Sequence, residues 1–151
     1  KGGGKPNIEP RRISKPVSVG GIMVRPVPVK HGCLTILGYT FTEQDRQAAY
    51  ITDCSALPSA GLRTILPCQT LIIGALRSKP HPTHFTFDQA FELIRLVYET
   101  GGQTLRQAFF THISHETSHV QIEELCTRYL SEHNLSGLTI APAFDMLHIE
   151  C

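Results

Sequence analysis

The sequence predicts an α/β (α+β) domain in which helices cover a mixed β-sheet. Two observations lead to this prediction. Short β-branched and aromatic runs, separated by turn residues, fill the first half of the chain, a pattern typical of consecutive strands. From about residue 86 onward, helical periodicity alternates with short apolar runs, which indicates strands connected through helices. The 151 residues suffice for one domain with its own core.

Strand candidates follow one another between residues 21 and 76. The run GIMVRPVPV (21–29) holds apolar residues and prolines that exclude a helix, so it predicts a strand near a sheet edge. Residues 34–42 and 48–53 are β-rich runs on either side of a polar turn, EQDRQ, and indicate a hairpin. Residues 58–67 are expected to hold one or two helical turns. The apolar run TLIIGAL (70–76) predicts a strand buried on both faces.

Helical periodicity begins in the second half of the chain. Apolar residues recur at helical spacing from Phe87 to Val97, with Thr86 as the expected N-cap and Gly101 as the expected stop. The remaining elements are expected at residues 105–113 (a strand), 118–134 (a second amphipathic helix) and 144–150 (the last strand).

Residues 1–21 are predicted to form a basic arm or linker, and residues 22–151 the folded domain. The arm is rich in glycine, proline and basic residues and offers little to bury. The first 30 residues carry a net charge of +6, which leaves −5 on the remainder because the whole chain carries +1. Such an arm is either a solvated leader or a contact for RNA or an acidic partner.

The composition also bears on the compartment. No apolar run approaches the roughly 18 residues needed to span a membrane, and no signal peptide is recognisable. Five cysteines show no C-x-x-C pair, so we expect reduced thiols in an intracellular compartment, the cytoplasm or an organelle matrix. Because the chain does not begin with Met, we expect a fragment, a processed form or an excerpt of a longer protein.

Imidazole and carboxylate side chains stand where the predicted strands end. His31 follows the first strand and Asp53 the third. His81 and His84 follow the run TLIIGAL, and His112 follows the next strand. Because loops at the carboxyl ends of strands gather in one crevice, we expect these side chains to converge. Imidazole and carboxylate groups are ligands of Zn²⁺ and Mn²⁺, so the pattern predicts a metal site.

The string THISHETSH (111–119) places three histidines close together. The strand-like residues before it favour His112 as a ligand at a strand end, with His115 outside the ligand shell or on the substrate side. His119 is expected to start the next helix. The residues expected to cap that helix are Ser114 with Thr117 or Glu116.

Six strings occur in order across residues 22–150: VPVKHG, GYTFT, AYITDCSALP, ALRSKPHPTHFTFDQAFELI, AFFTHISHET and AFDMLHIE. Together they resemble the metallo-β-lactamase superfamily, and in particular its PhnP-like phosphodiesterase branch, which is related to the tRNA 3′-processing ribonuclease Z. The resemblance implies a metal-dependent hydrolase that acts on a small or cyclic phosphodiester.

The resemblance also implies a role for each residue at a strand end. In a centre of two divalent metal ions, zinc or manganese, His31 and His112 would be terminal ligands. Asp53 would bridge the two ions. His84 would donate a proton to the leaving oxygen, and His81 would orient the loop that carries it.

One motif of the family is absent from the chain. No H-x-H-x-D-H occurs in these 151 residues, and because that motif belongs to the first half of the αββα sandwich, the chain corresponds to the second half. We therefore expect the missing ligands from an N-terminal half or a partner chain, with a homodimer as a further alternative. The chain alone is not expected to be catalytic.

Three interpretations of function remain open. The chain is the C-terminal part of a hydrolase, or a catalytically inactive component of a larger, RNA-containing assembly. The third is a thioester or lactone hydrolase on the same fold, because a fold alone does not fix a substrate.

Overall fold

The computed structural model describes residues 8–10 and 12–150, which form one seven-stranded sheet and three helices. The strands are β1 (Val17–Val19), β2 (Ile22–His31), β3 (Leu34–Glu43), β4 (Arg46–Ile51), β5 (Thr70–Gly74), β6 (Gln107–Thr111) and β7 (Thr139–Pro142). The helices are α1 (Ser59–Ile65), α2 (Phe87–Thr100) and α3 (His119–Glu132). Each predicted helix is present, and so is each predicted strand except the last.

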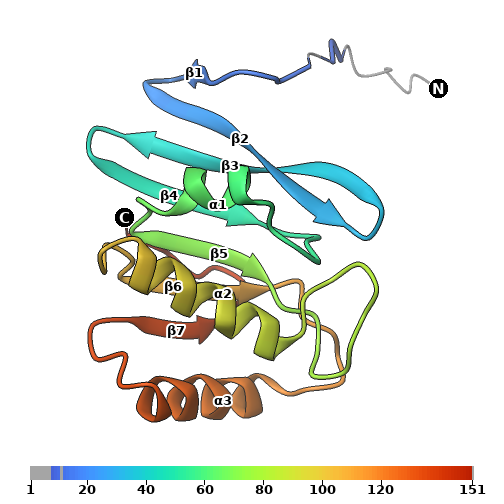
Figure 1. The fold of residues 1–151 in the computed structure, drawn as a ribbon, viewed down its shortest axis with the longest axis vertical. Helices are drawn as coiled ribbons and strands as arrows, with labels where there is room; N and C mark the ends of the chain where they lie inside the picture. Colours follow the sequence, from blue (N-terminus) through green and yellow to red (C-terminus); the bar gives the residue numbers. More distant parts are fainter. Residues whose placement is uncertain (1–7, 11, 151) are drawn as a thin grey trace, which may run out of the picture.

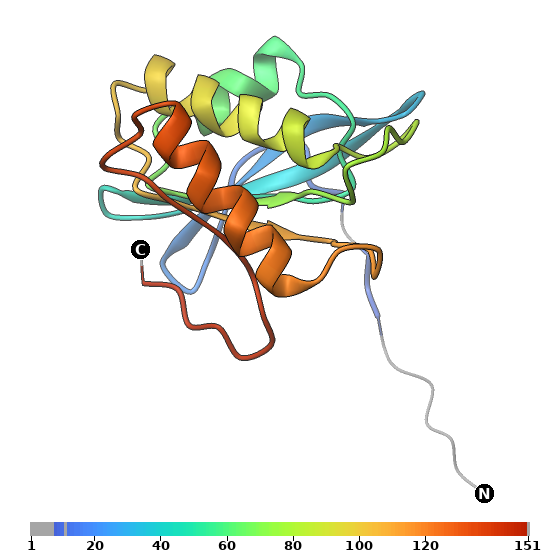
Figure 2. The same ribbon diagram turned by 90° about the horizontal axis from the view of Figure 1, so that it is seen from below.

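The strands lie in the sheet in the same order as in the sequence (Figure 1). Neighbours from β1 to β4 are antiparallel, whereas neighbours from β4 to β7 are parallel. A helix connects each parallel pair, and right-handed crossovers that all advance in one direction place their helices on one face. Figure 2 shows α1 and α2 together on one side of the sheet, and α3 packs against β7. The predicted α/β class with a mixed sheet is confirmed.

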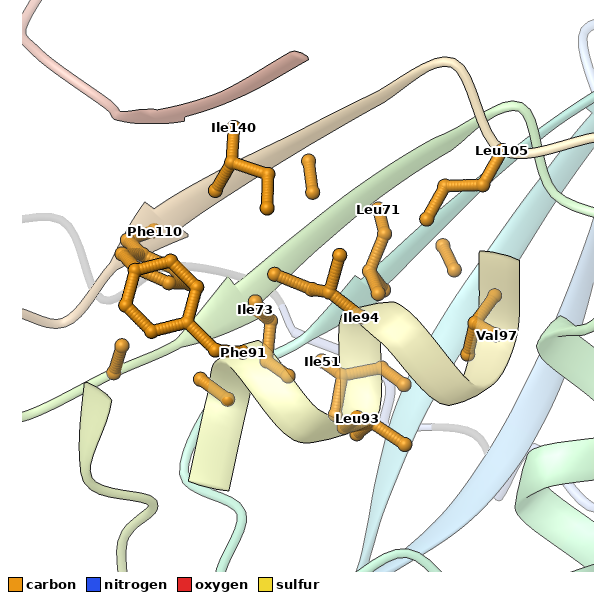
Figure 3. Packing of buried hydrophobic residues seen from close by; sticks show 14 of the residues in the cluster. Ile51, Leu71, Ile73, Phe91, Leu93, Ile94, Val97, Leu105, Phe110 and Ile140 are labelled. Atoms are coloured by element: carbon orange, nitrogen blue, oxygen red, sulfur yellow. The ribbon is translucent and has the colours of Figure 1, made fainter. Parts of the chain in front are cut away.

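The hydrophobic core lies between the sheet and the helices. Phe91, Ile94 and Val97 of α2 lie near the buried side chains of β5 and β6 (Figure 3). Among the latter, Phe110 meets the ring of Phe91 edge-on at a centroid distance of 4.9 Å. Each such side chain contributes roughly 1.5–3 kcal/mol through burial. This packing fixes the start of α2, and with it the end of the preceding loop.

Helix α2 begins and ends where the sequence predicts. The Thr86 hydroxyl accepts a hydrogen bond from the Gln89 backbone at 3.2 Å, and the Gln89 side chain accepts one from the Thr86 backbone at 2.9 Å. This reciprocal pair is a capping box. The helix ends at Thr100, and Gly101 is its C-cap.

The predicted cap of α3 is wrong, although the helix starts at His119 as expected. The N-cap is Ser118, whose hydroxyl accepts from the Gln121 backbone at 3.3 Å. Gln121 returns the bond by accepting from the Ser118 backbone at 2.9 Å. A capping box needs Ser or Thr three residues ahead of Glu or Gln, and the Ser118–Gln121 spacing satisfies it directly before the apolar face.

The predicted last strand at residues 144–150 is also wrong. The last strand is β7, Thr139–Pro142, which extends the parallel sheet by pairing with β6. Residues 144–150 mix apolar and polar side chains, but Phe144 and Met146 remain 58% and 84% exposed instead of packing as strand residues would. The short segment TIAP forms the last strand because the crossover helix before it, α3, delivers it next to a buried neighbour, β6.

The predicted arm contributes one strand to the sheet. Val17–Val19 form β1, which pairs with Ile22–Val24 of β2. Beyond Val24 this side of β2 has no β1 partner, so Pro26 and Pro28 lie along an edge, as the prolines predicted. Residues 1–7 and 11, which include Lys1, Lys5 and Arg11 of the basic arm expected to contact RNA, lie outside the described residues. The division into an arm at 1–21 and a domain at 22–151 otherwise stays a prediction.

The face of the sheet opposite the helices carries exposed apolar side chains. Alternate residues of a strand point to opposite faces, and Val27 and Ile51 are buried beneath the helices. We call the set on the other face the open apolar face. Its members are Ile22, Leu37, Phe41 and Tyr50, which are 37–41% exposed. Exposed apolar patches of this kind are typical of interaction surfaces.

Two further expectations can be compared with the structure. None of the helices in the described part of the chain is long and apolar enough to cross a membrane. Cys33, Cys54, Cys68 and Cys126 are free thiols, of which only Cys33 is exposed.

We expect Thr86→Ala to lower the free energy of unfolding by about 1 kcal/mol, because the capping box of α2 loses its hydroxyl acceptor. Urea denaturation followed by circular dichroism measures this change. Ser131→Ala, an exposed substitution in α3, is the control and should change stability by less than about 0.5 kcal/mol. Equal effects of the two substitutions would contradict the role of the cap.

The thiols should differ sharply in reactivity. Burial raises the pKa of Cys54 to about 11 and the pKa values of Cys68 and Cys126 to about 12. In a Cys151→Ser background at pH 8, we expect a disulfide reagent to modify Cys33 rapidly and the other three only after unfolding. Because these folded-state pKa values exceed the usual thiol value of about 8.5, stability should be constant below that pH and fall as the pH rises toward 11–12. A second fast-reacting thiol in the native protein would refute the assignment.

Candidate metal centre

Four loops meet at one edge of the sheet. His31 is the last residue of β2, Asp53 lies two residues after β4, and His112 directly follows β6. His84 belongs to the loop between β5 and α2. Strands β2, β4, β5 and β6 run in one direction, since β2 and β4 are both antiparallel to β3 and the others are parallel to β4. Their carboxyl ends therefore bring these loops to the same edge.

Four imidazoles and one carboxylate gather there. We call them the strand-end cluster: His31, Asp53, His81, His84 and His112. His84 is at its centre, with its ring centroid 4.8 Å from that of His31, 4.8 Å from that of His81 and 4.7 Å from that of His112. The side chain of His84 is only 15% exposed, whereas Asp53 and His112 are 45% and 41% exposed.

The carboxylate of Asp53 lies between two imidazoles. Its Oδ1 atom is 3.3 Å from Nε2 of His112 and 3.7 Å from Nδ1 of His84. Asp53 and His112 follow strands that flank β5, so their backbones are about two strand spacings, roughly 10 Å, apart. The side chains meet over the end of β5 at Gly74: a Cβ there would be in ordinary contact with both residues, 3.5 Å from the Asp53 nitrogen and 3.7 Å from the His112 Cβ.

The backbone at Asp53 and His112 is strained. Both residues have positive φ angles, 49° and 57°, in the left-handed region. Asp and His enter this region more readily than most residues, but the conformation still costs on the order of 1 kcal/mol each. The left-handed residues turn each loop at the end of its strand and aim the two side chains at one another.

A hydrogen bond fixes the ring orientation of His31. Its Nδ1 lies 3.0 Å from the carbonyl oxygen of Thr83, and because a carbonyl only accepts, Nδ1 carries the proton. The lone pair of His31 is therefore on Nε2. A hydrogen bond of this kind is the usual support of a metal-binding histidine.

Backbone hydrogen bonds hold the loops together. Phe85 donates to the carbonyl of Cys54 at 2.8 Å, which ties the residue after His84 to the residue after Asp53. Lys30 donates to Ala56 at 2.9 Å and so joins the end of β2 to the same loop. On the other side, Ala75 donates to Thr111 at 3.0 Å, next to His112.

Burial and charge lower the pKa of His84 below its usual value. Desolvation is the larger cause, and the neighbouring imidazoles of His112, His31 and His81 add to it, whereas Asp53 acts in the opposite sense. His84 is therefore neutral at pH 7. Its Nδ1 is buried and has no hydrogen-bond partner, which is unusual for a polar atom in a folded protein.

His81 and His115 differ in their relation to the cluster. Nδ1 of His81 lies 3.4 Å from the backbone nitrogen of Thr83 and 3.2 Å from its hydroxyl, so this ring contacts the residue that also orients His31. His115 is exposed. Its charge acts on Glu116, whose pKa is lowered mainly by the hydrogen bond from Arg77 and further by Lys79 and His115.

Three contributors to the site were not predicted from the sequence. Thr83 acts through its backbone carbonyl, and because every residue type has this acceptor, the sequence does not reveal its role. Ser55 accepts a hydrogen bond from the Gly32 backbone at 3.0 Å. Gly32 has a φ of 61°, and its place after His31 between two β-rich runs was a readable turn signal.

The donor set fits a divalent metal ion of the zinc or manganese type. It consists of imidazole nitrogens and one carboxylate, the ligands that such ions prefer. His31 presents a free Nε2, and the unpaired Nδ1 of His84 faces the Asp53 carboxylate. Ligand atoms of His31, Asp53 and His84 all lie within 4.8 Å of one another.

The fold and the site together define a β-lactamase-type domain. A family profile described as "Beta-lactamase superfamily domain" matches residues 3–113, and the chain belongs to this family. The expected metallo-β-lactamase superfamily membership is thereby confirmed.

Known proteins resemble the chain over much of its length. One similar crystal structure is described as a new diphosphatase from the PhnP family. It is 33% identical to this chain, with a TM-score of 0.68, and the match covers 93% of this chain and 48% of that protein. A "possible metal-dependent hydrolase" from Veillonella parvula is 14% identical with a TM-score of 0.66; 95% of this chain covers 60% of it. An octanoyltransferase of Porphyromonas gingivalis is 29% identical over 123 residues, which are 81% of this chain and 22% of that protein. The chain thus spans only part of the proteins it matches, about half of the diphosphatase.

We expect Gly32→Ala to destabilise the protein more than Gly102→Ala. Both glycines have positive φ angles, 61° and 67°, so both substitutions incur a similar backbone cost of about 1–2 kcal/mol. At Gly32 the new methyl group would also lie 3.0 Å from the Thr83 side chain, whereas nothing lies within 4 Å at Gly102. Urea denaturation of both variants isolates this contact. Equal losses of stability in the two variants would mean that the loop with Thr83 moves aside at no energetic cost.

Proposed function

We propose that the complete protein is a metal-dependent hydrolase of small or cyclic phosphodiesters. The observation that carries this proposal is the convergence of His31, Asp53, His84 and His112 from four loops on one edge of the sheet. A purely structural edge would have no physical use for three imidazoles around one carboxylate. Strain at Asp53 and His112 supports the proposal, because strained backbone gathers at functional sites.

His31, Asp53 and His112 are the residues we propose as metal ligands, with Asp53 shared between two ions. When bound, such ions activate water and neutralise charge on phosphate oxygens. The hydrogen bond from His31 to Thr83 supports this role, since it leaves Nε2 free.

We assign His84 to the leaving oxygen as a proton donor. It is the central imidazole of the strand-end cluster. Its pKa is lowered in the absence of substrate. A phosphodiester anion beside the ring would raise that pKa, so the proton would be taken up together with the substrate. His81 would act as a positioning residue through Thr83.

A phosphodiester is favoured as the substrate class by similarity. The diphosphatase of the PhnP family is 33% identical to this chain, and its description names a hydrolase that acts on phosphate. The octanoyltransferase match covers only 22% of that protein and bears weakly on substrate. The partly exposed Asp53 and His112 also suit a substrate whose charged end approaches from solvent.

We propose that an N-terminal half of the same protein supplies the remaining ligands. Three ligands from this chain are too few for two ions, each of which takes four or more. Gly74 alternates with the buried Ile73, so it faces the open apolar face, and the strand-end cluster lies against it. A second layer on the open apolar face would therefore bring its own loops to the same edge.

The test uses the complete protein, including the residues upstream of Lys1, loaded with Mn²⁺ or Zn²⁺ and assayed with bis(p-nitrophenyl) phosphate. We expect Asp53→Asn to abolish turnover and His84→Gln to lower kcat roughly 100- to 10,000-fold with unchanged metal content. His148→Gln, an exposed histidine outside the strand-end cluster, is the control. Undiminished activity in Asp53→Asn would refute the proposed centre.

A further inference from the structure

We propose that Arg77 is a positioning residue: through Glu116 it holds the loop that carries His112 against the loop that carries His84, and the reaction depends on that spacing. This inference deepens the proposed function and rests on it. Arg77 and Glu116 lie outside the strand-end cluster, so both act through the two histidines.

The two loops leave neighbouring strands at the same edge of the sheet (Figure 1). The loop between β5 and α2 carries His84, and the loop between β6 and α3 carries His112. The ring centroids of these histidines are 4.7 Å apart. A small displacement of either loop therefore changes the geometry of the strand-end cluster.

The backbone of Leu76 joins both loops to the end of β5. Leu76 donates a hydrogen bond at 2.9 Å to the carbonyl of Phe85, the residue directly after the histidine of the first loop. Its own carbonyl accepts one at 2.8 Å from Ser114, two residues after the histidine of the second loop. Leu76 thus lies between the loops, and Arg77 is the next residue along the chain.

Arg77 contacts one loop through its backbone and the other through its side chain. Its carbonyl accepts a hydrogen bond from the Phe87 backbone at 3.2 Å, and it forms an isolated parallel bridge with Thr86. Its Nη1 donates to Oε1 of Glu116 at 2.8 Å, across 39 positions of sequence. This hydrogen bond lowers the pKa of Glu116, so the carboxylate stays charged at neutral pH. Nε of the same guanidinium is buried, so packing encloses the inner part of the side chain.

The strained backbone at His112 needs such support. Its φ angle is 57°, and non-glycine residues persist in the left-handed region only where the surrounding structure holds them. Beyond Ser114 the second loop is exposed at His115 and Glu116. The ion pair with Arg77 ties this exposed part to the first loop.

An ion pair in this position contributes little to global stability. The side chains of Arg77 and Glu116 are 29% and 39% exposed, and water screens partly exposed pairs. Catalysis is more sensitive, because a displacement of about 1 Å in a reacting group can lower turnover roughly 100-fold. A positioning role therefore predicts a large loss of kcat with little loss of stability.

The test compares Arg77→Gln and Glu116→Gln with Arg95→Gln in the complete, metal-loaded protein. Arg95 is a matched control because its guanidinium is also partly exposed and paired, but with Glu92 at 2.6 Å and Glu99 at 3.3 Å inside α2. We expect the first two variants to lower kcat for bis(p-nitrophenyl) phosphate about 10- to 100-fold, with KM changed less than about twofold. The double variant should lose no more than either single one. Arg77→Lys should retain most of the activity, because it keeps a charged donor.

Hydrogen exchange of the Ser114 amide, measured on the complete protein without metal, gives a readout that is independent of activity. Its hydrogen bond to Leu76 anchors the second loop. Arg77→Gln should therefore speed this exchange about tenfold, whereas Arg95→Gln should leave it unchanged.

The outcomes separate this inference from the proposed function. Wild-type kcat in both Arg77→Gln and Glu116→Gln, or an equal loss in Arg95→Gln, overturns the inference and leaves the proposed function intact. Unchanged Ser114 exchange in Arg77→Gln also contradicts the inference alone. Absence of turnover in the wild-type protein contradicts the proposed function.

Discussion

The in-register parallel pairing of β4, β5 and β6 is the constraint on which the site depends. Ile51 lies opposite Ile73, and Gly74 opposite Thr111, so the three strands end in step. Asp53 and His112 consequently leave the sheet at one level on either side of β5. A one-residue slip of either strand would turn one of these side chains to the other face. Buried Ile51, Ile73 and Phe110 oppose such a slip, because it would expose them. The apolar core therefore sets the position of the polar cluster.

Much of the fold was readable because periodicity and burial coincide in it. The run from Phe87 to Val97 has one apolar face, and that face is the one buried against the sheet. The run TLIIGAL is almost entirely apolar because it contains β5, a central strand with another strand paired on each side. The candidate site was readable for the same reason: a polar residue directly after such a run must lie at the sheet edge. Prediction failed for residues 144–150, which mix apolar and polar side chains but form no strand in the described part of the chain.

The finer features of the site were not readable for physical reasons. The Thr83 carbonyl is identical in every residue type, so its bond to His31 exists only in the folded chain. Asp53 and His112 adopt left-handed turns because their loops must close in the folded protein. Asp and His tolerate this conformation but do not require it, so the sequence does not predict it. His112 lies nearer to the Asp53 carboxylate than His84 does, at 3.3 Å against 3.7 Å, a difference well below an ångström. Residue spacing in the sequence carries no information at that scale.

The strict sequence order of the strands has a consequence for how the chain acquires its structure. Each strand pairs with the strands that precede and follow it in the chain, but the parallel pairs join residues 22 to 37 positions apart, such as Ala48 with Thr70 and Thr70 with Gln107. The loop and helix between two parallel strands must close before that pairing forms, and sheets with long-range parallel pairing fold slowly. The antiparallel strands β1 to β4, which tight turns connect, are therefore expected to pair before the parallel strands β5 to β7 join the sheet.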